Sequence, residues 1–242
     1  MVHAVAGPDR ADFRRVARPD AGLFTHRVNY PVAAWIALRA FRARLRPSAL
    51  TLTNLILGVG TSIAVIVVAP WFGSGWAHVA AGVAAWLLWQ VAYCLDCADG
   101  QLARVAGVSS AAGGRLDVLC DIAVQVALVG AVIEVASSAG PRYPPWLPGV
   151  FAASWMVNMV TSVMAKEGTN DSLVTSRSAA VQTVKMVRDY GFILTVIAVC
   201  VAVQPAAMVW VMVSFTVVNA GFLMASIVRA AVTAWRAGPI AG

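Results

Sequence analysis

Apolar positions along the chain gather into six runs, at about residues 50–70, 75–95, 117–138, 147–165, 190–204 and 207–228. A helix needs about 20 predominantly apolar residues to cross a bilayer, with a lower limit of about 17. The fifth run is the short one, because Gln204 and Pro205 end it early. The pattern predicts an all-α membrane protein whose six transmembrane helices occupy a domain at residues 47–232.

The two ends of the chain have a different pattern. Residues 1–26 are polar and rich in arginine, which predicts a flexible cytosolic tail. In residues 27–46, Trp35 and Phe41 alternate with arginines, which is typical of an amphipathic helix that lies on the membrane interface. Residues 233–242 are expected to form a second cytosolic tail.

Composition supports a membrane protein and sets aside nucleic acid as a partner. The chain is 60% apolar and 12% charged, whereas soluble domains carry about 25% charged residues. Its formal net charge is +7. Because the basic residues lie between apolar runs, membrane topology and contact with anionic lipid explain this charge better than binding to nucleic acid.

The basic residues also predict an orientation. With six spans and both termini in the cytoplasm, every one of the 18 Lys and Arg except Arg142 falls on the inner side. Cytoplasmic loops are the ones that carry an excess of basic residues. We therefore expect a multi-pass protein of the cell membrane, with residues 96–117 at the cytoplasmic face.

Four aspartates lie in or beside the apolar runs, where a charged side chain is energetically unfavourable. Asp96 and Asp99 are three residues apart, and Asp117 and Asp121 are four apart, so each pair shares one face of a helix. The connection at 105–116 is rich in Gly, Ser and Ala, which favours a turn between two helices. The spacing thus predicts that four carboxylates face one another across two consecutive helices.

Repelling carboxylates in an apolar setting require cations. Hard divalent ions prefer oxygen ligands, so the cluster predicts a site for two divalent cations, Mg²⁺ or Mn²⁺. Two such ions can hold a phosphoryl group during displacement. Arg104 would add a fixed positive charge for phosphate. A polar network or an ion path is the plainer interpretation of the same acids.

The spacing D-x2-D-G-x2-A-R-x8-G-x3-D-x3-D resembles the motif of the CDP-alcohol phosphotransferase family. The fixed positions of that motif are all present, as Asp96, Asp99, Gly100, Ala103, Arg104, Gly113, Asp117 and Asp121. The family's run at the entry to the first span is partly present at residues 47–51, where Ser48 replaces an asparagine. Ile122 stands where many members carry a basic residue.

The resemblance implies an enzyme of phospholipid biosynthesis. It would transfer a substituted phosphoryl group from a CDP-alcohol, commonly CDP-diacylglycerol, to a polar alcohol and release CMP. The resemblance implies that all four aspartates bind metal and that Asp121 is also the general base. It also implies a homodimer as a possible assembly, and a nucleotide site formed by Thr51, Gly100, Ala103, Arg104 and Gly113.

The acceptor is left open. Arg177, Lys185 and Arg188 lie in a basic loop that would suit a phosphorylated alcohol such as inositol phosphate or glycerol phosphate. The same charges are also what any cytoplasmic loop would carry. Two alternative functions remain: transfer of a CDP-linked head group to a lipid or soluble alcohol, and ion-coupled transport.

Overall fold

The computed structural model describes residues 7–18, 21–72, 76–167 and 189–236, and among them it contains helices and turns but no strand. A π-helical turn at Thr25–Asn29 leads into α2, and 3₁₀ turns at Ala69–Trp71 and Pro205–Ala207 flank two long helices. The helices are α1 (Arg10–Arg15), α2 (Tyr30–Arg42), α3 (Pro47–Val68), α4 (Ala77–Val105), α5 (Ala111–Ala139), α6 (Leu147–Glu167), α8 (Tyr190–Val203) and α9 (Met208–Arg236).

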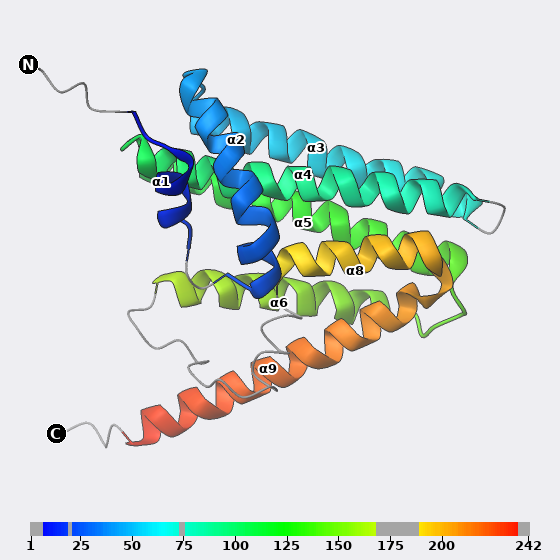
Figure 1. Ribbon diagram of the computed structural model, residues 1–242. Coiled ribbons are helices and arrows are strands. Elements are labelled where there is room, and N and C mark those ends of the chain that lie inside the picture. The colour runs from blue at the N-terminus through cyan, green and yellow to red at the C-terminus, as the bar shows by residue number, and fades with distance from the viewer. Residues whose placement is uncertain (1–6, 19–20, 73–75, 168–188, 237–242) are drawn as a thin grey trace, which may run out of the picture.

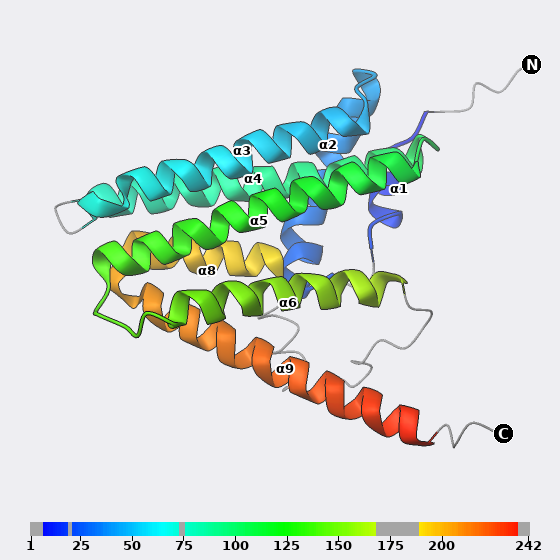
Figure 2. The same ribbon diagram turned by 180° about the vertical axis from the view of Figure 1, so that it is seen from behind.

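The long helices form a bundle. α3 packs against both α4 and α5, α8 packs against α4, and α6 packs against α9, while α2 runs across the bundle (Figures 1 and 2). The largest buried cluster includes Trp89 of α4, Val132 of α5, Trp155 of α6, Ile197 of α8 and Met212 of α9. One apolar core therefore joins all the long helices from α3 onward.

Four helices are long and apolar enough to cross a membrane: Pro47–Trp71, Ala77–Val105, Ala111–Ala139 and Pro205–Val232. Two shorter apolar helices lie at Leu147–Val160 and Tyr190–Val203. The all-helical fold is confirmed for the described residues, four helices are candidate membrane spans, and each predicted run has a helix. The count of six spans remains a prediction, because four helices of the described residues meet the length and hydropathy of a membrane span.

Helix boundaries explain where the acidic residues lie. α4 continues past its apolar run to Val105 and so carries Asp96 and Asp99 in regular helix. The turn that follows contains Gly107 at a φ of +67°, a left-handed conformation that glycine adopts without strain. α5 then begins six residues before its apolar run, because the Ser110 side chain accepts a hydrogen bond from the Gly113 N–H and caps the helix.

α2 lies within the segment predicted to be an interfacial helix. Its buried face consists of small residues, such as Ala33 and Ala37, which allow close packing against α4. Val32 and Trp35 are about half exposed, and the Arg39 guanidinium lies 4.9 Å from the centre of the Trp35 ring. Contact of this exposed face with the membrane surface remains a prediction.

The contact between α4 and α8 depends on Gly82. A Cβ atom at position 82 would lie only 2.5 Å from the backbone N of Ala202. The backbone of α8 can move away only by disturbing its other contacts. Gly60 of α3 is the opposite case, because nothing lies within 4 Å of its Cβ position.

We expect Gly82→Ala to destabilise the purified protein by about 1–3 kcal/mol, as overpacked cores do. Gly60→Ala is the matched control and should be neutral or slightly stabilising, since alanine favours helix. Thermal unfolding in detergent measures both. Equal melting temperatures for the two variants would show that the α4–α8 contact is not as close as described.

Candidate metal and nucleotide site

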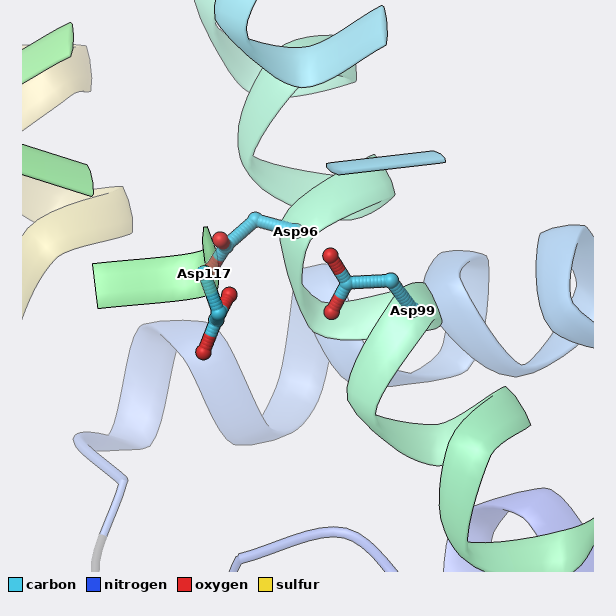
Figure 3. A group of neighbouring side chains, drawn as sticks. All are labelled: Asp96, Asp99 and Asp117. Carbon is cyan, nitrogen blue, oxygen red and sulfur yellow. The ribbon is translucent and has the colours of Figure 1, made fainter. Parts of the chain in front are cut away.

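Three of the predicted aspartates meet between α4 and α5. Asp96 and Asp99 come from one face of α4, and Asp117 comes from the first turns of α5. Each offers a carboxylate oxygen, and these oxygens lie within 4.8 Å of one another. Figure 3 shows the three side chains directed toward a common space. Asp99 is the most buried of the three, with 5% of its surface exposed.

Asp121 lies one helical turn after Asp117 and lines the same cavity. Asp96 lines this cavity as well, so residues of both acid pairs border the same space between the two helices. Asp121 is outside the group of three close carboxylates. Its role as a metal ligand and as a base remains a prediction.

α3 supplies the groups that orient the acids of α4. The Thr51 hydroxyl donates a hydrogen bond to Asp99 Oδ2. One turn later, the Asn54 amide lies 3.4 Å from Asp96 Oδ1. Both α3 side chains are buried. Groups that hold a carboxylate in this way fix its direction and so shape any metal site that it forms.

Asn54 was not among the residues predicted from the sequence, although a signal for it exists. Thr51, Asn54, Gly58, Thr61 and Ser62 recur at helical spacing in a mostly apolar span. All five are buried in the bundle. Polar residues on one face of a membrane helix point toward other helices and away from lipid, so the stripe marks the face that meets the acids.

Arg104 folds back over Gly100 one turn earlier on α4. A Cβ at position 100 would lie 3.1 Å from one guanidinium nitrogen of Arg104. The Arg104 Nε–H also donates a hydrogen bond to the Val16 carbonyl, at 2.9 Å. Because glycine has no side chain, position 100 leaves room for the Arg104 guanidinium, which any larger residue would crowd.

Two cavities meet at the acidic cluster. The first, of about 310 Å³, is lined by all four aspartates and extends toward Tyr190. The second, of about 980 Å³, lies between α3, α4 and the start of α5. The second brings together every residue predicted to bind the nucleotide: Thr51, Gly100, Ala103, Arg104 and Gly113. Asp99, Gly100, Arg104 and Asp117 line both cavities.

The donor set fits a hard divalent cation. Asp96, Asp99 and Asp117 provide only carboxylate oxygens, the ligands that Mg²⁺ and Mn²⁺ prefer. The four cysteines are free thiols, and none belongs to this group of ligands. The predicted acceptor residues Arg177, Lys185 and Arg188 lie outside the described residues.

Apolar helices of spanning length and a carboxylate cluster beside a large cavity are the features of a membrane protein with a candidate metal site. The family model described as CDP-alcohol phosphatidyltransferase matches residues 44–232. The chain therefore belongs to this family of transferases, which move a substituted phosphoryl group from a CDP-alcohol in phospholipid biosynthesis. No curated protein sequence matches the chain.

Thr51→Val should weaken binding of Mn²⁺ about 10–100-fold, because it removes the hydroxyl that orients Asp99. Thr53→Val is the matched control: Thr53 is exposed on α3, and its hydroxyl contacts only the carbonyl of Ala49 in the described hydrogen bonds. Titration of the detergent-solubilised protein with Mn²⁺, followed by electron paramagnetic resonance, gives both affinities. Wild-type affinity in Thr51→Val would exclude this orienting role.

Proposed function

We propose that the protein transfers a phosphatidyl group from CDP-diacylglycerol to a polar alcohol and releases CMP. The observation that carries this proposal is the junction of the two cavities at the aspartate cluster. One cavity holds the acids, and the other holds the residues expected to contact cytidine diphosphate. Such a junction can place the donor's diphosphate and an acceptor hydroxyl side by side.

The chain's own residues suit the steps of this transfer. Thr51, Gly100, Ala103, Arg104 and Gly113 would line the cytidine diphosphate site. Asp121 would take the proton from the acceptor hydroxyl. The acceptor oxygen then forms a bond to the β-phosphorus of the donor, the bond from that phosphorus to the bridging oxygen breaks, and CMP leaves.

Asp96, Asp99, Asp117 and Asp121 would hold two divalent cations, Mg²⁺ or Mn²⁺. When bound, these cations supply electrostatic stabilisation of the charge that develops on the transferring phosphoryl group. Thr51 and Asn54 would keep the carboxylates Asp99 and Asp96 in the required direction.

For the acceptor, we propose a phosphorylated alcohol such as inositol phosphate or glycerol phosphate. Support comes from the basic loop that contains Arg177, Lys185 and Arg188. The enzyme would lie in the cell membrane with both termini and the site on the cytoplasmic side, as the distribution of basic residues predicts. A homodimer within the bilayer is part of the same proposal.

Two other functions are distinguished by the donor and the product. Transfer of a CDP-linked head group to a lipid or soluble alcohol uses the same motif with a water-soluble donor. Ion-coupled transport would need no nucleotide at all. Membership in a family of transferases favours the two transfer reactions over transport. The two classes also differ in a measurable product, because transport releases no CMP.

Release of CMP is the direct test. We expect the purified protein to release CMP from CDP-diacylglycerol in the presence of Mg²⁺ or Mn²⁺ and at least one alcohol from a panel that includes glycerol phosphate and inositol phosphate. A chelator should abolish the release, and either metal should restore it. If no combination of CDP-linked donor and alcohol yields CMP, both transferase proposals fail.

Asp121→Asn should reduce turnover by about 10²–10⁴-fold, because the amide cannot accept the acceptor's proton. Binding of CDP-diacylglycerol should change much less. Glu134→Gln is the control on the same helix. Glu134 lies more than three turns further along α5, where its carboxylate accepts a hydrogen bond from the Ser138 hydroxyl. Full turnover in Asp121→Asn would remove Asp121 from the role of base.

A further inference from the structure

The described part of the N-terminal segment, residues 7–18 and 21–29, packs against the bundle beside the acidic cluster, although it precedes the family-matched region. α1 begins with a capping box between Asp9 and Asp12. Its Phe13 is fully buried among the alanines of α2 and residues Ala98 and Leu102 of α4. The segment is thus anchored on the helix that carries Asp96 and Asp99.

Two further contacts hold the segment on either side of Arg18. On one side, the Val16 carbonyl accepts a hydrogen bond from Arg104. On the other, the backbone N–H and the hydroxyl of Thr25 donate to the two carboxylate oxygens of Asp189, at 2.9 and 2.6 Å. Asp189 is 3% exposed, so this contact is an internal one. Arg18 lies between these fixed points.

Arg18 lines both cavities, together with Asp99, Gly100, Arg104 and Asp117. Arg104 also lines both cavities, so the two cations lie where the cavities join. Like charges at close range are destabilising, and an anion between them removes the repulsion. A planar guanidinium group can donate two parallel hydrogen bonds to two oxygens of one phosphate.

We propose that Arg18 is a substrate-binding residue, and that Arg18 and Arg104 together bind a phosphate group of a substrate at the junction of the two cavities. The N-terminal segment is then part of the active site. This inference rests on the proposed transferase function and adds a ligand-binding residue from outside the matched region. The phosphate belongs either to the diphosphate of the donor or to a phosphate monoester on the acceptor.

The test compares Arg18→Gln with Arg18→Lys and with Arg14→Gln. Arg14 is exposed on α1, lines neither cavity, and loses the same charge when changed. CMP release is followed while CDP-diacylglycerol and sn-glycerol 3-phosphate or inositol phosphate are varied in turn. We expect Arg18→Gln to raise one KM about 10–100-fold, as loss of charge-assisted hydrogen bonds does, with a smaller change in kcat. Arg18→Lys should recover part of the loss.

The two arms separate the sources of the phosphate. A raised KM for CDP-diacylglycerol assigns Arg18 to the donor, and a raised KM for the phosphorylated alcohol assigns it to the acceptor. KM values in Arg18→Gln that equal those of Arg14→Gln for both substrates overturn the proposal.

A binding measurement keeps this result separate from the transferase proposal. Calorimetry with CDP and with sn-glycerol 3-phosphate needs no turnover, so it reports on the anion site even if no CMP is released. Weaker binding of either probe to Arg18→Gln than to Arg14→Gln supports the site. Equal binding of both probes to the two variants, or no binding of either probe to the wild-type protein, overturns it.

Discussion

The cost of placing carboxylates inside an apolar bundle is the constraint on which this structure depends. A buried ionised group loses its hydration and is stable only where hydrogen bonds or cations replace it. Asp99 meets this condition in part through the Thr51 hydroxyl, and Asp96 through the Asn54 amide. α3 therefore has to lie against α4 with its polar stripe facing the acids, and the rest of the bundle is arranged around that pair.

Small residues make the necessary approach between helices possible. At Gly58 of α3, a Cβ would lie 2.8 Å from a methyl carbon of Val124 on α5. Gly82 allows a similar approach between α4 and α8. Backbones that pack this closely bring side chains as short as aspartate within reach of each other across helices. The large cavity survives beside them because Gly100, Ala103 and Gly113 put little bulk into it.

Polar contacts between distant parts of the chain complete the cavity walls. Thr25 contacts Asp189, and its hydroxyl also lies 3.2 Å from that of Tyr93, one turn before Asp96 on α4. Asn29 reaches Gln90, which in turn binds the Gly191 carbonyl at the start of α8. These bonds join the N-terminal segment, α4 and α8 at the end of the bundle where the aspartates lie.

The sequence by itself determined the helices, their apolar character and the two aspartate pairs. These properties are local, because hydropathy and helical spacing depend only on neighbours along the chain. It predicted Thr51 only through the family resemblance, it predicted Arg104 from its charge as well, and it did not predict Asn54. The short apolar run ending before Pro205 also became a short helix, as the proline requires.

Only the tertiary structure decided which groups surround the acids. The placement of Asn54 beside Asp96, of Arg104 over Gly100, and of Arg18 at the cavity junction depends on helix packing between residues far apart in the chain. Periodicity indicates which face of a helix is buried, as the stripe on α3 does, but it does not say which residue of another helix that face meets. The four aspartates were therefore predictable from the sequence, whereas Asn54 and Arg18 could be placed beside them only by the tertiary structure.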